Sequence, residues 1–443
     1  MGARRRHRVK RGFPFRPRAW HGRGVADHPL RATINDELHA RPHPRLTAPA
    51  VLSHVVLMAG EADAEADRER FAAFCRDNAA PPPPPDARHH AVAAGGRTVR
   101  WERHGEFTAV TVIADAVADL PGQAGSALTP PLAAWLDTLP GERLAAVHLR
   151  VLPGFASAPA AEAFAGEAVG STVGEGAGAV FADFRIGPDG FTRMLLYAHR
   201  LTPGRLGRMA QRLLEIETYR MAALLGLPPA RAATPKLAAF ERRLDAIVAA
   251  TSAAAEDDHT LLDRLTRLAA EAEALAAANR FRFAATEAYG ALVTARIAEL
   301  REGHIEGAQR LGLFLERRFV PGLRTCAAVA RRERTLLDGI ARAGGMLRTR
   351  VEVRLAAQNR DLLEAMDRRA RLQLRLSQAV EGLSVFAIAY YAVSLLKYVG
   401  EGAPLLGLPD AGKLAGLVGP PLVIAAAWFS VRRIRKGLRQ DGQ

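Results

Sequence analysis

The chain has 443 residues, of which 49% are hydrophobic and 24% are charged, and its net charge is +15. This composition excludes a disordered polypeptide, and the length is sufficient for two or three folded units. Only two cysteines occur, Cys75 and Cys326, so the chain has neither a disulfide framework nor a zinc site built on several cysteines. Such sparse cysteine usage fits the reducing cytoplasm.

The basic excess fits two kinds of partner. One is nucleic acid, and the other is the anionic cytoplasmic leaflet of a membrane. Because no zinc-finger or RNA-binding signature is found, we expect no specific nucleic-acid partner and favour anionic lipid at the basic termini. The first of these termini is residues 1–26, which contain no acidic residue and which we expect to form a disordered basic arm.

A segment rich in histidine and arginine follows, with the sequence HPLRATINDELHARPHPRL at His28–Leu46. We expect a short helix over Ile34–Ala40, which Pro42 terminates. The spacing of His39 and His43 allows two imidazoles on one helix to hold a metal ion.

The prolines on either side of His43 favour a different interpretation of this segment. It then forms a polar structural network, or a site for an anion or a partner built on Arg31 and Arg41. A metal ion remains the alternative. The candidate binding motif comprises His28, Arg31, Asn35, Glu37, His39 and Arg41.

Residues 27–202 are predicted to form a cytoplasmic mixed α/β domain with a six- to seven-stranded sheet. Short apolar runs and alternating patterns between glycine and proline residues indicate the strands. Strands are expected at Ala50–Met58, His90–Ala94, Arg97–Arg103, Phe107–Ile113, Leu144–Leu152, Ala179–Ile186 and Phe191–Ala198, and helices at Glu61–Asn78 and Pro131–Leu139. The glycine-rich stretch Gly170–Phe184 lacks the Lys-Ser/Thr ending of a P-loop, so we expect no phosphate loop there.

The rest of the chain is predicted to be helical. Residues 203–322 form a helical domain with helices at Leu206–Leu225, Pro235–Ala278 and Phe283–Arg318. Residues 323–378 form a stalk with an apolar seam whose members recur at steps of four and seven. The seam comprises Ile340, Leu347, Val351, Leu355, Leu362 and Met366. Such a seam packs as a coiled coil against other helices or against copies of itself, and we expect a homo-oligomer.

Two apolar stretches near the end of the chain predict a transmembrane hairpin. Residues 379–399 and 414–431 approach the roughly 20 residues that a helix needs to cross a bilayer, and the loop 400–413 joins them. The stretch 414–431 carries no charge, and the basic tail 432–443 follows at once. This pattern disfavours the alternative, two buried core helices of a soluble domain.

Basic residues on the outer flanks of the hairpin predict its orientation. They are Arg368, Arg369, Arg371 and Arg375 before the first span, and Arg432, Arg433, Arg435, Lys436 and Arg439 after the second. Positive flanks stay in the cytoplasm. We therefore expect both termini in the cytoplasm and the loop 400–413 on the other side of the membrane.

Polar residues follow one side of the first span, and polar groups within a membrane face protein or water. The candidate pore face comprises Ser377, Glu381, Ser384, Tyr391 and Tyr398. One interpretation is an ion path in an oligomer, with Glu401 and Asp410 at the pore mouth and a divalent cation as the transported ion. The other is a helix–helix interface with interfacial tyrosines.

Three segments resemble one family: HPLRATINDELHARP (His28–Pro42), WERHGEF (Trp101–Phe107) and LEIETYRMAALLG (Leu214–Gly226). The chain resembles an uncharacterised bacterial family of predicted membrane-anchored proteins, a domain of unknown function that spans nearly the whole chain from Asp27. The resemblance implies an anchor in the bacterial inner membrane and no established activity.

The order of the predicted domains also resembles CorA-type divalent-cation channels. An α/β domain, long helices, a stalk and two C-terminal spans occur in both. That family carries a Gly-Met-Asn signature at the end of its first span, where this chain has Tyr398-Val399-Gly400-Glu401-Gly402. Because the Met-Asn pair is missing, the resemblance does not imply that this chain selects cations as that family does.

The sequence contains no G-x-S-x-G or H-E-x-x-H motif, and its dispersed histidines have no recognisable ligand spacing. These histidines are His54, His104, His148, His199, His259 and His304. We expect no enzyme and no cofactor. The fold class is α+β. The leading hypothesis is a bacterial membrane-anchored protein of unknown function with a cytoplasmic α/β domain, and its sharpest form is a CorA-like oligomeric ion channel. The alternative is a non-transporting membrane anchor that presents a cytoplasmic domain to a ligand or partner.

Overall fold

The computed structural model describes residues 27–37, 42–85, 87–115, 125–154, 164, 167–253, 256–402 and 411–440. It divides into two compact units. The first, which we call the sheet unit, comprises residues 1–246 and 266–340. The second, the stalk unit, comprises residues 247–265 and 341–443.

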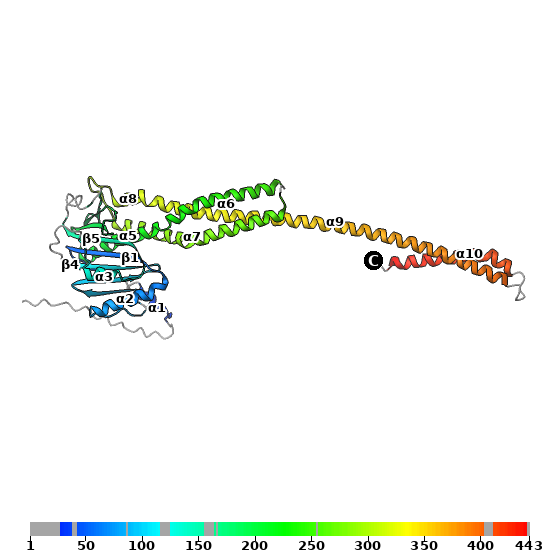
Figure 1. Cartoon of the computed structure of the whole chain (residues 1–443), viewed down its shortest axis with the longest axis horizontal. Coiled ribbons are helices and arrows are strands. Elements are labelled where there is room, and N and C mark those ends of the chain that lie inside the picture. Colours follow the sequence, from blue (N-terminus) through cyan, green and yellow to red (C-terminus); the bar gives the residue numbers. More distant parts are fainter. Residues whose placement is uncertain are drawn as a thin grey trace, which may run out of the picture. The chain divides into compact units, whose positions relative to one another are not determined.

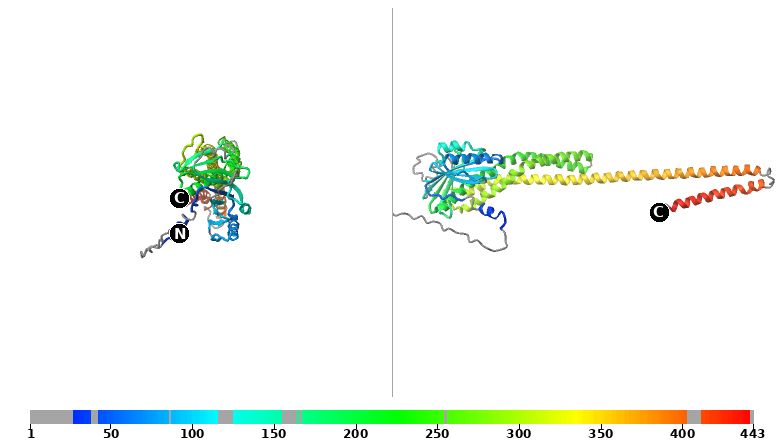
Figure 2. Two further views of the ribbon diagram at one scale, coloured as in Figure 1. Left: turned by 90° about the vertical axis from the view of Figure 1, so that its left-hand side faces the viewer. Right: turned by 90° about the horizontal axis from the view of Figure 1, so that it is seen from below.

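The sheet unit contains one sheet of mixed type (Figures 1 and 2). It has eight strands in the order β2-β3-β4-β1-β5-β8-β7-β6. All neighbouring strands are antiparallel except β5 and β8, which are parallel. The strands are β1 (Ala50–Met58), β2 (His89–Ala94), β3 (Arg97–Arg103), β4 (Phe107–Asp115), β5 (Glu142–Pro153), β6 (Val169–Val173), β7 (Gly178–Ala182) and β8 (Thr192–Ala198).

The sequence predicts seven of these strands, and the expected six- to seven-stranded sheet is at least one strand too small. The missed strand is β6, which lies in the glycine-rich stretch Gly170–Phe184 and pairs with β7. Glycine is required there because a Cβ at Gly170 would lie 2.5 Å from the ring of Phe181. The turn between the two strands has positive φ at Gly174, Glu175 and Gly176. The glycines that obscured the strand pattern are therefore the residues that permit the hairpin.

Helices cover both faces of the sheet because successive side chains of a strand point to opposite faces. In β1, Val51 and Val55 pack towards the helices α2 (Ala64–Asp77) and α3 (Pro130–Leu136). Leu52 packs on the other face, against α5 (Pro203–Leu224). Two short helices, α1 (Arg31–Glu37) and η1 (Glu61–Asp63), complete the first half of the chain.

The long helices differ from the prediction in where they end. They are α6 (Leu227–Ala253), α7 (Asp258–Leu300), α8 (Leu311–Arg318), α9 (Val320–Gly402) and α10 (Ala411–Gln440). The expected helices Pro235–Ala278 and Phe283–Arg318 are wrong in their bounds, since α7 starts inside the first and runs into the second. Asp257 explains the start of α7, because its carboxylate accepts the backbone N–H groups of His259 at 3.1 Å and Thr260 at 3.4 Å.

Two of these helices have proline in their first turn. Pro228-Pro229 lie in the first turn of α6, and Pro321 lies in the first turn of α9. Proline is tolerated in the first turn because the backbone N–H groups there have no partner within the helix. Helix α9 consequently contains the predicted stalk and the predicted first span without interruption.

In the stalk unit, the end of α9 and α10 pack as an antiparallel hairpin. Gly382, Val385 and Ala389 of α9 are half-buried, and Gly419 of α10 would place a Cβ 3.7 Å from Leu396. Within the described residues, one helical stretch is long and apolar enough to cross a membrane, Leu311–Glu401, with an 18-residue window of mean hydropathy 1.7 that is 0% buried. The expected second span corresponds to a shorter apolar stretch, Gly416–Phe429.

The packing of α5 against the segment that leads into β1 gives a test of this fold. A Cβ at Gly207 would lie 1.6 Å from the carbonyl oxygen of Pro44. We predict that Gly207→Ala lowers the free energy of unfolding by about 1–3 kcal/mol, the usual cost of overpacking. Gly204→Ala is the matched control, because its nearest neighbour is the flexible end of Arg208 at 3.7 Å. Equal stability of the two variants in a denaturant titration would contradict this packing.

Candidate functional site

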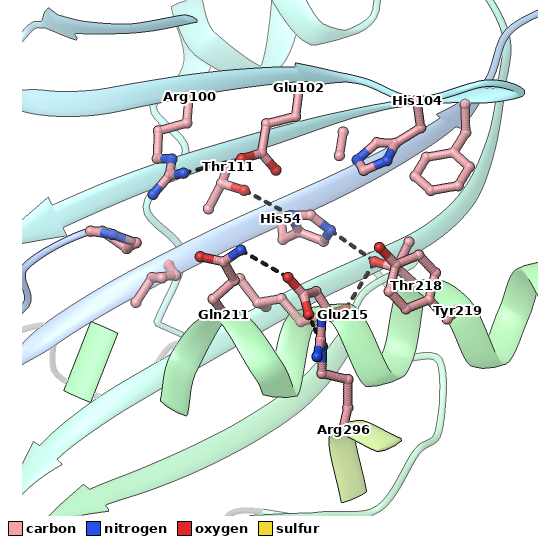
Figure 3. Close-up of a pocket in the computed structure, with 15 residues that line it drawn as sticks. His54, Arg100, Glu102, His104, Thr111, Gln211, Glu215, Thr218, Tyr219 and Arg296 are labelled. Atoms are coloured by element: carbon pink, nitrogen blue, oxygen red, sulfur yellow. Dashed lines mark hydrogen bonds and ion pairs between the residues drawn. The ribbon is translucent and has the colours of Figure 1, made fainter. Parts of the chain in front are cut away.

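A cavity of about 250 Å³ lies between the sheet and α5 (Figure 3). Strands β1, β3 and β4 form its floor, α5 forms its roof, and Arg296 of α7 closes one side. Ten of the fifteen residues that line this space are polar or charged, in contrast to the apolar layers around it. The residues that matter for its chemistry are His54, Arg100, Glu102, His104, Thr111, Gln211, Glu215, Thr218, Tyr219 and Arg296.

The register of three strands places the polar floor. His54 of β1 pairs with Thr111 of β4, and Thr111 pairs with Arg100 of β3. Cross-strand partners point to the same face of a sheet. The three side chains therefore lie in one row under α5, and Glu102 joins them two residues further along β3.

His54 connects the floor of the cavity to its roof. Its Nδ1 lies 2.8 Å from the Thr111 hydroxyl and its Nε2 lies 3.0 Å from the Thr218 hydroxyl. Because the Thr218 hydroxyl donates to the Leu214 carbonyl at 2.8 Å, it accepts from Nε2–H, and Nδ1 accepts from Thr111. Burial, together with the nearby charges of His104 and Arg100, lowers the pKa of His54 to about 3. The imidazole is thus neutral at physiological pH.

An ion pair on the floor supplies charge of both signs. Arg100 donates to Glu102 at 3.1 Å, and their side chains are only 8% and 16% exposed. His89 of β2 lies 3.9 Å from the same carboxylate. Removing two charges from water is costly, and apolar residues of similar volume are commonly at least as stable. Stability alone therefore does not account for a charged pair here.

A chain of polar contacts forms the roof. His43 lies 2.9 Å from the Gln211 side chain, and Gln211 donates to Glu215 at 2.8 Å. Glu215 also pairs with Arg296, which donates in turn to Glu299 at 2.8 Å. The roof thus carries a second pair of opposite charges, opposite the Arg100–Glu102 pair of the floor.

The segments that carry the family resemblance meet at this cavity. The WERHGEF segment contributes Glu102, His104 and Phe107, and the LEIETYRMAALLG segment contributes Leu214, Glu215, Thr218 and Tyr219. Pro42, the last residue of the first segment, lines an adjoining cavity of about 220 Å³ that shares Pro44 and Arg100 with the first. Segments far apart in sequence therefore build one polar site.

Alternate residues at the start of WERHGEF point to opposite faces of the sheet. Glu102 lines the cavity, whereas Trp101 and Arg103 point to the opposite face and hold Asp67 of α2. The indole of Trp101 donates to Asp67 at 3.1 Å, and the Thr108 hydroxyl donates to it at 2.6 Å. Burial raises the pKa of Asp67. The residues of WERHGEF that point to this opposite face are therefore structural.

The candidate binding motif does not form this site as a whole. His28, Arg31 and Asn35 are exposed and do not line the cavity. Arg31 pairs with Asp27, and the Nδ1 of His28 accepts the Leu30 N–H at 3.2 Å. The side chain of Glu37 and the whole of His39 and Arg41 lie outside the described residues.

The metal hypothesis stays a prediction, because His39 is outside the described residues. His43, its expected partner, bonds to Gln211 at the cavity roof instead. In the part of the chain that the structure describes, no three His, Cys, Asp or Glu side chains are grouped so that they could hold a metal ion.

The candidate pore residues Ser377, Glu381, Ser384, Tyr391 and Tyr398 are all exposed on α9. Ser384 donates to the Val380 carbonyl at 2.9 Å, and Glu381 lies at the edge of a cleft between α9 and α10. At the candidate mouth, Glu401 lies 3.9 Å from Lys397, and Asp410 is outside the described residues.

A second histidine group lies on the face opposite the cavity. His148 Nδ1 is 2.8 Å from the Ser53 hydroxyl, and its Nε2 is 3.7 Å from Asp189. The arrangement contains the residue types of a hydrolytic triad, but Ser53 is 0% exposed and its oxygen accepts the Ala127 N–H at 2.8 Å. A buried and fully bonded hydroxyl is structural. Burial lowers the pKa of His148 to about 4.

Sequence reasoning missed His54, Arg100, Glu102 and His104 as site residues. A usable signal was present, because β1 reads as a buried apolar strand with Ser53 and His54 at its centre. Polar residues inside a buried strand need partners. The pattern could not show that His54 and Arg100 come together, since this depends on which strands are neighbours.

The buried histidine gives a pH-dependent test. The fold favours neutral His54, so its stabilisation is complete above the ordinary pKa of 6.5 and is lost as the pH falls from there towards 3. We predict that wild-type protein loses about 2 kcal/mol more unfolding free energy between pH 7 and pH 5 than His54→Gln, which keeps a donor and an acceptor. The exposed His199→Gln should behave as wild type. Parallel stability profiles for wild type and His54→Gln would show that folding does not lower the pKa of His54.

Comparison with known proteins identifies the family of the chain. No curated protein and no solved structure matches it. A family model matches residues 26–438, which is nearly the whole chain and includes every segment of the cavity. The chain belongs to the family described as "Protein of unknown function (DUF3422)".

Proposed function

We propose that this protein is a membrane-anchored binding protein whose sheet unit holds a small polar molecule in the cavity between the sheet and α5. The observation that carries the proposal is the presence of two ion pairs, Arg100–Glu102 and Arg296–Glu215, on opposite walls of one cavity. Each wall offers both a cation and an anion to the space between them. We assign the cavity a binding role rather than a catalytic one.

The charges favour a small zwitterion as the ligand. A purely anionic ligand would face Glu102 and Glu215, and a purely cationic one would face Arg100 and Arg296, at a cost that grows in a partly buried site. A molecule that carries both signs, of the size of an amino acid, pairs with both. The cavity of about 250 Å³ lies below the usual range for drug-sized ligands.

Ligand binding can be tested by thermal unfolding of the full chain in neutral detergent. We expect at least one of the twenty amino acids to raise Tm, with about 2.7 kcal/mol of stabilisation at one hundred times Kd, whereas acetate and methylammonium have no effect. Arg100→Met should abolish the rise. Arg185→Met, at an exposed arginine outside the cavity, should preserve it. A panel without any shift, or a shift that persists in Arg100→Met, would contradict the proposal.

We further propose that residues 379–399 and 414–431 anchor the protein as two spans of a bacterial inner membrane, with both termini in the cytoplasm. The arginine flanks support this orientation, as does the antiparallel packing of α9 on α10. The shorter apolar stretch Gly416–Phe429 requires local thinning of the bilayer or help from the helix beside it. The basic ends then lie at the anionic cytoplasmic leaflet.

Cysteine labelling tests the topology. Both native cysteines are buried, so they need not be replaced. We predict that Leu405→Cys, in the loop 400–413, reacts with a membrane-impermeant maleimide in spheroplasts, and that Gln443→Cys reacts only after lysis. The reverse order would overturn the orientation, and labelling of both before lysis would exclude two spans.

Ion passage is a second candidate function, and one observation favours it. Gly382, Val385 and Ala389 face α10, whereas Ser384 and Tyr391 are exposed on another side of α9. The candidate pore face is therefore available to line an axis if copies associate through the stalk. A divalent cation would then be the transported ion. Mass photometry of the full chain in detergent tests ion passage. An axial pore requires a symmetric oligomer, so a monomer would exclude this function.

A further inference from the structure

A group of arginines gathers at the start of α5, beside the ligand cavity but outside it. Arg205, Arg208 and Arg212 recur at three and four residues, so they share one face of the helix. Together with Arg301 they line a pocket of about 190 Å³, and Glu299 is the acidic residue in its wall. The pocket therefore carries an excess of positive charge.

Two of these arginines, both exposed, have no carboxylate partner among the described residues. Among the described residues, no carboxylate pairs with Arg205 or Arg208, whereas Arg212 pairs with Glu299 at 2.8 Å and Arg301 with Glu175 at 2.5 Å. Guanidinium groups bind phosphate oxygens in a bidentate manner. The first turn of α5 contains no acidic residue that would compensate the positive end of the helix dipole. The convergence of unpaired cations and helix dipole favours an anion.

We propose that this pocket is a second binding site, specific for a phosphate group, with Arg205 and Arg208 as its primary ligands. The phosphate belongs either to a free anion or to a phospholipid headgroup, since both present the same oxygens. The site is separate from the zwitterion cavity, and its existence does not rest on the function proposed for that cavity.

The pocket is connected to the cavity through an unbroken series of ion pairs. Arg212 holds Glu299, Glu299 holds Arg296, and Arg296 holds Glu215 in the cavity roof. A phosphate that binds Arg212 competes with Glu299 for it. Glu299 then pairs more strongly with Arg296 and draws that guanidinium away from Glu215. Phosphate therefore changes the charge that the roof presents to a ligand, a coupling that does rest on the proposed function.

Calorimetric titration with inorganic phosphate tests the site directly. We expect the full chain, in nanodiscs of neutral lipid at low ionic strength, to bind phosphate, and Arg205→Gln/Arg208→Gln to weaken Kd at least about tenfold, as the loss of two charge-assisted contacts requires. The matched control is Arg231→Gln/Arg242→Gln, which removes the same charge from two exposed arginines of α6. Its Kd should equal that of the wild type.

Nanodiscs that contain phosphatidylglycerol separate the two sources of phosphate. If the wild-type chain loses its binding of inorganic phosphate in these discs, a lipid headgroup occupies the site. Unchanged binding means that the site serves a free anion. Both results support the proposal. It is overturned if neutral-lipid discs show no phosphate binding, or if the α5 and α6 double variants bind phosphate equally well.

Discussion

The structure of the site depends on one buried imidazole. His54 accepts from Thr111 of β4 and donates to Thr218 of α5, so a single side chain links two strands of the sheet to the helix that covers them. The link requires a neutral ring. In a protonated ring Nδ1 would carry a hydrogen, so it could no longer accept the hydrogen bond that the Thr111 hydroxyl donates. Burial enforces this state by lowering the pKa of His54 to about 3. The roof and the floor of the cavity keep their separation through this contact.

Charge pairing around that link explains how a polar space persists inside a folded unit. Arg100 pairs with Glu102 on the floor, and Arg296 pairs with Glu215 on the roof. Each pair is net neutral, so neither wall repels the other. Around the rim, Phe107, Tyr219 and Tyr289 form an aromatic cluster with ring centroids 5.7–6.5 Å apart. These rings bury large apolar areas and offset part of the desolvation cost of the charges.

Local patterns predicted the elements well, because a strand or helix is specified by its own residues. Strands β1 and β3 have the expected bounds, and alternation within β3 also determines which residues face the cavity. Prediction failed where a residue has two physical roles. Glycines in β6 permit close packing rather than a loop, and Pro228-Pro229 lie in the first turn of α6, ahead of the helix start that was expected at Pro235. Local patterns could not predict the site, because His54 and Arg100 are brought together only by the strand order β3-β4-β1.

Two of the segments that carry the family resemblance line the cavity, whereas the described side chains of the candidate binding motif do not. WERHGEF and LEIETYRMAALLG both reach the cavity, while the histidines and arginines chosen from the first segment lie on the surface or outside the described residues. The most direct measurement is an experimental structure of the full chain in lipid, saturated with the amino acid that stabilises it most. We expect ligand density between Arg100 on the floor and Arg296 on the roof. Density elsewhere, or a cavity closed by direct contact of the two ion pairs, would contradict this expectation.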